Sequence, residues 1–203
     1  MAVITISRQF GAGGKTLGEM IANELGYIFL DDVVIQEISK EANVSAAWVK
    51  SVERTAGGTF SKFISGMLSS SYMERMVGDG KGYIDENIYI EKLHEVIRRF
   101  AEQDNVVLMG RGGQYILNDF KDAYHILLIA DIESRIKFIQ RFHDVSNAKV
   151  EQLVMQGEKR RASLYKKFHR ADYNQPHLYH LVLNMDKLSL EKALQIVCLL
   201  VQK

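Results

Sequence analysis

The sequence is almost free of cysteine and proline, and the shortage of cysteine excludes particular classes of protein. One cysteine, Cys198, and one proline, Pro176, occur among the 203 residues. An internal disulfide framework needs at least two cysteines and is therefore excluded, and a cysteine-based zinc site is disfavoured. The histidines show no metal-ligand spacing with acidic partners, so we interpret them as structural or surface residues. We interpret Cys198 as a filler of the hydrophobic core.

An excess of charge of one sign and a long apolar run are missing too. The 26 basic residues are balanced by 25 acidic ones, so the formal net charge of +1 argues against a whole-protein polyanion binder. No run approaches the roughly 18 apolar residues of a membrane span, and the start MAVITISRQF lacks a secretory signal. We expect a cytoplasmic protein without a membrane or nucleic-acid partner, and the sequence leaves its oligomeric state open.

Five short apolar segments are rich in β-branched residues and predict buried strands. They cover residues 3–7, 27–30, 105–109, 124–129 and 180–184. Longer helix-like stretches separate them, and each segment is a nearly continuous apolar run rather than an alternating one. Both features are typical of a parallel sheet covered on its two faces. The sequence therefore predicts an α/β three-layer fold.

The stretch between the second and third predicted strands is too long for a simple crossover. It contains helix-like patterns at residues 33–42, 45–54, 60–76 and 83–101. Glycines at 57–58 and across 78–82 are breakers that would let this stretch move. We interpret it as a helical insertion suited to closing over a substrate.

Another helix-like stretch, residues 146–170, ends in the basic sequence EKRRASLYKKFHR. This part carries six lysines and arginines against the single acid Glu158. Its residues alone leave two interpretations open: an exposed basic helix, and a nucleic-acid surface with Tyr165, Phe168 and Tyr173 as stacking platforms, which the small net charge disfavours. The last stretch, residues 189–201, opens with Ser189 as a predicted helix cap.

A glycine-rich segment, SRQFGAGGKTLG at residues 7–18, lies between the first predicted strand and a helix-like stretch. Such a segment brings backbone amides together at a helix amino terminus, where they bind phosphate. Lys15 is suited to neutralising the β and γ phosphates, and Thr16 to contacting a magnesium ion. The residues expected to hold the phosphates are Gly11, Ala12, Gly13, Gly14, Lys15 and Thr16. We therefore expect ATP and Mg2+ as cofactors.

This segment departs from the standard phosphate-loop pattern. The pattern G-x-x-x-x-G-K-[ST] requires glycine at the place that Gln9 holds. One alternative is a simple glycine-rich turn of an α/β protein. Another is a dinucleotide-binding loop, which is disfavoured because Thr16 stands where that pattern has its third glycine.

Three stretches carry a resemblance to a known family: ITISRQFGAGGKTLGEMIANELGY, VVLMGRGGQYIL and LYHLVLNMDKLSLEKALQIV. With them the chain resembles the cytidylate kinase-like family of P-loop nucleoside monophosphate kinases over nearly its whole length, least so at 43–82. The resemblance implies one domain, 1–203, with a five-stranded parallel sheet of order 2-3-1-4-5. It also implies a monophosphate-binding insertion at 33–103, a lid-like region at 132–175, and transfer of phosphate from ATP to a nucleoside monophosphate such as CMP or dCMP.

The resemblance further implies arginines around the phosphates. Arg111, in MGRGG, matches the family's glycine-arginine element and is assigned to acceptor binding and catalysis. In the lid-like region it implies a catalytic role for Arg135 and Arg161 and substrate binding for Arg141 and Arg160, since a guanidinium suits phosphoryl oxygens. The alternative for Arg135 and Arg141 is a solvated helix face with ion pairs. Asp31 and Asp32 match an acidic position near substrate and metal, with Asp32 assigned to the substrate; the alternative is a helix cap.

The alignment of the glycine loop leaves two functions open. When Thr16 and Leu17 are laid on the Thr-Leu of cytidylate kinases, Gly14 falls where the catalytic lysine belongs and Lys15 falls one place late. Its flexible stem would still let Lys15 reach the phosphates; otherwise an arginine such as Arg8 or Arg161 must supply the charge. The alternatives are an ATP-dependent nucleoside monophosphate kinase and a nucleotide- or anion-binding regulatory protein with weak or no kinase activity.

Overall fold

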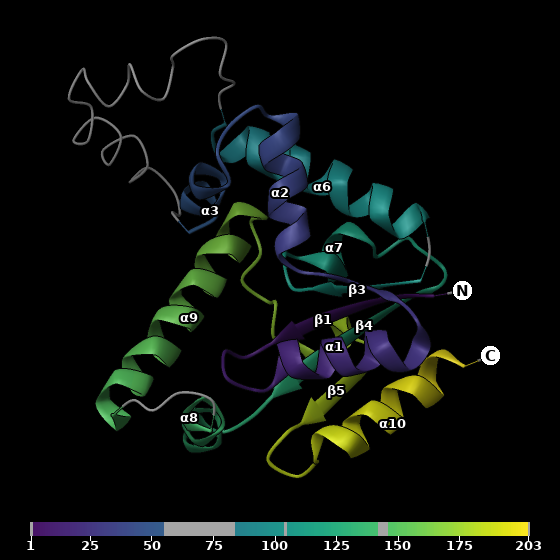
Figure 1. Ribbon diagram of the computed structural model, residues 1–203, viewed down its shortest axis with the longest axis vertical. Coiled ribbons are helices and arrows are strands. Elements are labelled where there is room, and N and C mark those ends of the chain that lie inside the picture. Colours follow the sequence, from purple (N-terminus) through teal and green to yellow (C-terminus); the bar gives the residue numbers. More distant parts are fainter. Residues whose placement is uncertain (1, 55–83, 104, 142–145, 203) are drawn as a thin grey trace. The chain divides into compact units, whose positions relative to one another are not determined.

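The apolar segments pair into one five-stranded parallel sheet (Figure 1). Its strands are β1 (Val3–Arg8), β2 (Ile28–Leu30), β3 (Val106–Met109), β4 (Ala123–Ile129) and β5 (Leu181–Asn184). They lie in the order β2-β3-β1-β4-β5. The predicted strands and the predicted order 2-3-1-4-5 are therefore confirmed, and the boundaries differ by one residue at half of the strand ends.

The structure of the protein, a computed structural model, describes residues 2–54, 84–103, 105–141 and 146–202. The helix expected at 60–76 and the glycine breakers at 57–58 and 78–82 lie outside these residues. By the density of contacts the chain splits into two compact units. The first unit comprises Met1–Asp31, Ile97–Lys159 and Asp172–Lys203, and the second unit comprises Asp32–Val96 and Arg160–Ala171.

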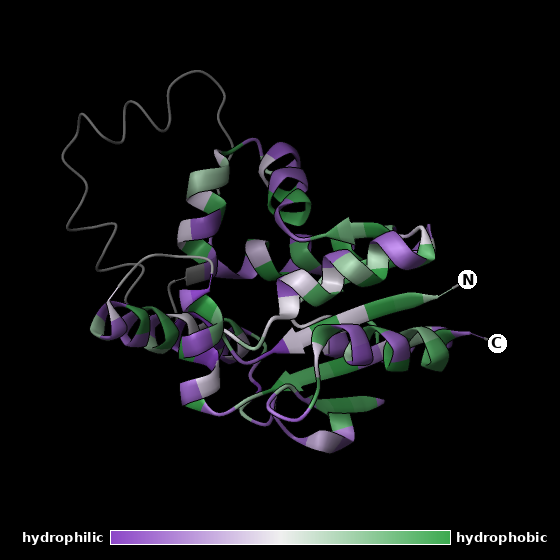
Figure 2. Cartoon of the chain, turned by 60° about the horizontal axis from the view of Figure 1, so that its bottom comes forward, coloured by the Kyte–Doolittle hydropathy of each residue, from purple (hydrophilic) through white to green (hydrophobic). Residues whose placement is uncertain are grey.

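One face of the sheet is covered by α1 (Gly14–Leu25) and α10 (Leu190–Val201), which pack side by side (Figure 1). Alternate strand residues point toward these helices, because side chains on a strand repeat with period two. The buried strand residues of this face are Ile4, Ile6, Val107, Met109, Ile126, Leu128 and Leu183. In Figure 2 the strands are mostly green, the colour of hydrophobic residues, whereas the helices alternate between green and purple.

The opposite face is covered by α7 (Gly113–Ile116), and the last turns of α6 (Glu86–Glu102) contact α7. A methyl group on Gly113 would lie 2.8 Å from Cδ2 of Leu108 and 3.0 Å from Cγ2 of Thr5, so glycine lets α7 approach the strands closely. Arg98 of α6 donates to the carbonyl oxygen of Ile116 at 3.0 Å. Helices on both faces make the fold an α/β three-layer fold, as predicted.

The second unit is helical in its described part. It contains α2 (Asp32–Glu41), α3 (Ala46–Arg54), the start of α6, and the end of α9 (Asn147–Lys167). Tyr89 of α6 is buried and donates through its hydroxyl to Glu53 at 3.0 Å. The predicted boundaries of the insertion, 33–103, and of the lid-like region, 132–175, stay predictions.

The ends of α1 and α10 follow from local sequence. Gly13 and Gly26 flank α1 with φ of 79° and 68°, in the left-handed region that favours glycine. At α10 the Ser189 hydroxyl accepts a hydrogen bond from the amide of Lys192 at 3.2 Å, which confirms the predicted cap. Cys198, on the same helix, is buried, and burial raises the pKa of its thiol.

A buried histidine joins β1 and β4 below α7. Nδ1 of His125 lies 2.8 Å from the Thr5 hydroxyl, and its backbone amide donates to Nδ1 of His180 at 2.9 Å. Burial, together with the neighbouring His180 ring, lowers the pKa of His125 to about 4. His125 is therefore neutral in the folded protein near neutral pH, in line with a structural role.

Candidate phosphate-binding site

The glycine loop and the turn after β3 lie at the same edge of the sheet. Because β1 and β3 are neighbouring parallel strands, their carboxyl ends are adjacent, and ligands of open α/β sheets bind at this edge. The amide of Gly110, after β3, donates to the carbonyl oxygen of Ile6 at 2.9 Å. The side chain of Gln9, after β1, accepts from the amide of Ala130 at 2.9 Å. The first unit alone therefore supplies this edge.

The loop ends in a helix amino terminus that favours anions. Gly11 and Gly13 have φ of 91° and 79°, so that glycine suits both positions. Within the described residues, no hydrogen-bond acceptor meets the backbone amides of Gly13, Gly14, Lys15 and Thr16. Unpaired amides and the helix dipole together make a positive end of the kind that attracts anions.

Other amides of the loop are already used within the protein. The amide of Gln9 donates to Leu128 at 3.0 Å, and the amide of Ala12 donates back to the carbonyl oxygen of Gln9 at 3.0 Å. Ala12, which we expected among the phosphate-binding residues, thus closes the loop on itself through its amide. A ligand role for it stays a prediction.

A carboxylate of α9 accepts a hydrogen bond from the loop. Glu158 of α9 accepts a hydrogen bond from the amide of Phe10 at 2.6 Å. Its Oε1 also lies 3.2 Å from Nη1 of Arg135, on α8 (Ile132–Gln140). In the sequence Glu158 is the lone acid of a basic stretch, and nothing local indicates a partner 148 residues away.

Arg135 packs against the glycine loop. Its side chain is 11% exposed, and a methyl group on Gly11 would lie 2.9 Å from its Cβ. Its Nη1 also donates to the carbonyl oxygen of Phe10 at 3.4 Å. Arg135 is thus used in supporting the loop, and the catalytic role that we predicted for it stays a prediction.

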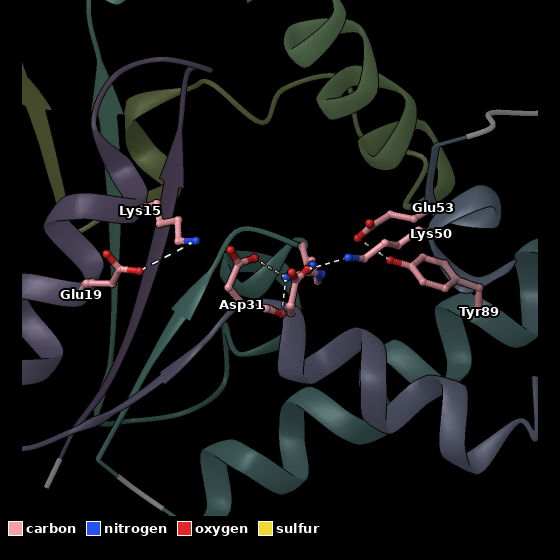
Figure 3. A network of polar contacts seen from close by, with 8 residues as sticks. Lys15, Glu19, Asp31, Lys50, Glu53 and Tyr89 are labelled. Carbon is pink, nitrogen blue, oxygen red and sulfur yellow. Dashed lines mark hydrogen bonds and ion pairs between the residues drawn. The ribbon is translucent and has the colours of Figure 1, made fainter. Parts of the chain in front are cut away.

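The turn after β3 has an unusual backbone. Gly110, Arg111 and Gly112 have φ of 66°, 51° and 73°, so three consecutive residues are left-handed. Glycine adopts this conformation readily, whereas it strains an arginine, and such strain persists only where the surroundings impose it. Nη1 of Arg111 donates to the carbonyl oxygen of Asp31 at 2.8 Å and to its Oδ1 at 3.0 Å (Figure 3). This pairing fixes a guanidinium whose side chain is only 9% exposed.

The side chain of Lys15 is largely exposed and lies near Glu19. Its side chain is 67% exposed, and its Nζ lies 3.9 Å from Oε1 of Glu19, one turn along α1 (Figure 3). An exposed pair of this kind holds a lysine only weakly. The predicted catalytic role of Lys15 would require its side chain to leave Glu19.

The remaining predicted residues lie in the second unit or at the surface. Asp32 begins α2 and pairs with Lys50 at 3.1 Å, in the second unit (Figure 3). Arg160 and Arg161 belong to the same unit, with the Arg161 guanidinium 5.7 Å from the centre of the Tyr165 ring. Arg141 is exposed at the end of α8. Their roles at the phosphates stay predictions.

Thr16 is the predicted magnesium contact. It lies in the first turn of α1 and is partly exposed, next to the unpaired amides. A hydroxyl at this place suits a magnesium ion that arrives with a bound nucleotide. In the described parts of the chain, no group of three or more histidine, cysteine or acidic residues could hold a metal ion.

Fold and site together define a class of protein. A parallel sheet of order 2-3-1-4-5, whose first strand leads through a glycine loop into a helix, is the α/β fold of the P-loop kinases. The chain belongs to the cytidylate kinase-like family, whose model matches residues 3–187. The resemblance of the chain to this family is confirmed.

Solved structures share the fold at low sequence identity. An uncharacterized protein from Eubacterium ventriosum is 15% identical, with a TM-score of 0.69 over 98% of this chain and 97% of that chain. A sugar kinase from Janibacter has 14% identity and a TM-score of 0.52 over 98% and 93% of the two chains. Shikimate kinase from Acinetobacter baumannii, in complex with shikimate, has 14% identity and a TM-score of 0.51 over 99% and 93%.

No curated protein shows significant similarity to the sequence. In the part of the chain that the structure describes, no helix is both long and apolar enough to cross a membrane.

Proposed function

We propose that the protein is an ATP-dependent kinase that transfers the γ-phosphoryl group to a nucleoside monophosphate of the CMP or dCMP type. The observation that carries the proposal is the pair of anion-attracting features on adjacent strands. Unpaired amides open α1 after β1, and the buried Arg111 follows β3. Phosphoryl transfer needs two phosphate sites at one edge of the sheet, and membership of a kinase-like family supports this use.

The amino terminus of α1 would hold the donor. The amides of Gly13, Gly14 and Lys15 would bind the phosphates of ATP, where the helix dipole adds a positive potential. Mg2+ bound with the nucleotide neutralises phosphate charge, and the Thr16 hydroxyl would contact it. Gly11 and Gly13 give the loop the left-handed backbone that leads into α1.

Arg111 would hold the acceptor phosphate. Arg111 presents a planar fork of donors that matches phosphate oxygens, and Asp31 limits its rotation. In the reaction, an oxygen of the acceptor phosphate attacks the γ-phosphorus, the bond to the β-phosphate oxygen breaks, and ADP leaves. The protein contributes position and positive charge rather than covalent chemistry.

A turnover assay tests the proposal. Purified protein with ATP and Mg2+ would be given CMP, dCMP, UMP, AMP and shikimate in turn, and ADP formation measured. We expect the highest kcat/KM with CMP or dCMP. Preference for shikimate, or ADP formation independent of any acceptor, would contradict the assignment.

One observation favours a second function. The exposed Lys15, paired with Glu19 rather than held over the loop, fits a nucleotide- or anion-binding regulatory protein without efficient transfer. Nucleotide binding measured by calorimetry, with no turnover on the whole panel, would identify this alternative.

A further inference from the structure

Gly14 is a glycine for reasons of space rather than backbone conformation. It opens α1 in a helical conformation, and the positive φ angles of the loop belong to Gly11 and Gly13. A methyl group on Gly14 would lie 2.7 Å from Cγ of Arg8. Its distances to Cβ and Cδ of Arg8 would be 3.1 and 3.2 Å. The Arg8 side chain therefore fills the space into which any side chain at position 14 would extend.

The far end of the Arg8 side chain reaches the turn after β3. A methyl group on Gly110 would lie 2.4 Å from Nη1 of Arg8. The side chain thus runs from the amino terminus of α1 to the turn that carries Arg111. Its guanidinium lies between the two anion-attracting features of this edge. Arg8 itself is anchored by β1, where it pairs in register with Leu128.

A kinase of this architecture needs a cation beside the terminal phosphates of the donor. Lys15, the expected cation, is two-thirds exposed and lies on the side of Glu19. Arg8 is half-buried, and its stem crosses the first residue of α1. A half-buried cation next to unpaired amides acts more strongly on a phosphate than an exposed one, because solvent screens it less.

We propose that Arg8 supplies the positive charge that binds the terminal phosphates of the donor nucleotide, in place of Lys15. The inference rests on the proposed function for the identity of the donor. In this arrangement the cation comes from β1 rather than from α1. The absence of a side chain at Gly14 leaves room for it. A guanidinium can also donate two parallel hydrogen bonds to phosphate oxygens, which an ammonium cannot do.

Inorganic tripolyphosphate is the probe that separates this inference from the proposed function. Its affinity would be measured by calorimetry in the presence of Mg2+ for the wild type, Arg8→Gln, Arg8→Lys and Lys15→Gln. Loss of a charge-assisted contact predicts about 10- to 100-fold weaker binding by Arg8→Gln. Arg8→Lys, which keeps the charge, should bind more tightly than Arg8→Gln, and Lys15→Gln should lose clearly less than Arg8→Gln.

Lys121→Gln is the matched control for loss of one positive charge. Lys121 is exposed and precedes β4, at the opposite end of the strands from the loop. The affinity of Lys121→Gln for tripolyphosphate should therefore equal that of the wild type. Melting temperatures of all variants show whether each is folded at the temperature of the measurement.

A charge swap keeps the test decisive if Arg8→Gln is unstable. Arg8→Gly removes both the cation and the obstruction, and the double variant Arg8→Gly with Gly14→Lys returns a cation from the helix side. The double variant should bind tripolyphosphate at least five-fold, on the order of 1 kcal/mol, more tightly than Arg8→Gly. Equal affinities of these two variants would overturn the inference.

Two further outcomes would overturn the inference. A larger loss in Lys15→Gln than in Arg8→Gln overturns the inference, and so does a wild type that binds no tripolyphosphate. A wild type that binds tripolyphosphate through Arg8 but phosphorylates no acceptor supports the inference and refutes the proposed kinase function.

Discussion

The ring of Phe10 lies against the backbone of Gly157, so closely that a methyl group on Gly157 would come within 2.2 Å of Cγ of Phe10. The next residue of α9, Glu158, accepts the hydrogen bond from the Phe10 amide. A single turn of α9 therefore contacts the glycine loop through the Glu158 side chain and through the backbone of Gly157. The shape of the loop depends on a helix far along the chain.

Gly157→Ala should weaken the contact between α9 and Phe10. The added methyl group cannot fit beside the Phe10 ring, and overpacking of this kind costs about 1 to 3 kcal/mol of the free energy of unfolding. We expect a lower melting temperature and weaker binding of tripolyphosphate, measured by calorimetry. Phe10→Ala added to Gly157→Ala should recover part of the loss, as in a double-mutant cycle.

Met155→Ala is the control for this prediction, because Met155 is 70% exposed on the same helix. It should leave both quantities close to the wild-type values. If Gly157→Ala behaves like Met155→Ala, the contact does not shape the loop.

Arg111→Ala should weaken the acceptor much more than the donor. Losing the charge-assisted contact to the acceptor phosphate costs on the order of 1.5 to 3 kcal/mol, whereas the donor amides stay in place. KM for CMP should rise well above its wild-type value while KM for ATP changes little. Arg98→Ala, which removes an arginine paired with Asp119, is the matched comparison. A similar rise in both constants for Arg111→Ala would argue against an acceptor-side role.

Stability should fall in mild acid because of His125. Its pKa is about 4 in the folded protein and near 6.5 when unfolded, so the unfolded chain binds more protons between these values. The stabilisation is complete above pH 6.5 and is lost as the pH falls through 4, on the order of 3 kcal/mol in total.

The measurement is urea unfolding between pH 4 and 7, with His125→Gln and His177→Gln. His125→Gln should flatten the pH dependence relative to the wild type, whereas the exposed His177→Gln should not. Carboxylates that titrate in this range contribute equally to all three proteins, so the comparison isolates the buried imidazole. Parallel curves for wild type and His125→Gln would show that His125 does not carry the effect.

Ser189→Ala should destabilise the protein through the start of α10. Its hydroxyl accepts the Lys192 amide, and loss of such a cap costs about 1 kcal/mol. Urea unfolding should show a lower midpoint with an unchanged slope. Ser189→Asp, which keeps an oxygen at this place, should retain most of the stability; a midpoint as low as that of Ser189→Ala would contradict the capping role.

The strands and their order could be predicted because the information is local or carried by resemblance. Nearly continuous β-branched runs mark strands buried on both faces, as at Val106–Met109. The cap at Ser189 is local in the same sense. The resemblance to the kinase-like family supplied the order of the strands, which periodicity alone does not fix.

The contacts that shape the candidate site could not be predicted, because they join distant positions. Arg111 pairs with a residue 80 positions earlier, and Phe10 with one 148 positions later. The left-handed backbone at Arg111 is also invisible in the sequence, since glycine, not arginine, is expected there. The crossing of Arg8 over Gly14 depends on side-chain direction at the end of a strand, which the motif does not encode.

The pairing of Arg111 with Asp31 means that an anion arriving there does not meet an empty site. Oδ1 of Asp31 lies 3.0 Å from Nη1 of the guanidinium. If Arg111 holds the acceptor phosphate as proposed, the phosphate would share this cation with Asp31, and its free energy of binding would be the gain over the existing ion pair rather than the full strength of a new one. A phosphate dianion would then gain more at the turn after β3 than a singly charged ligand.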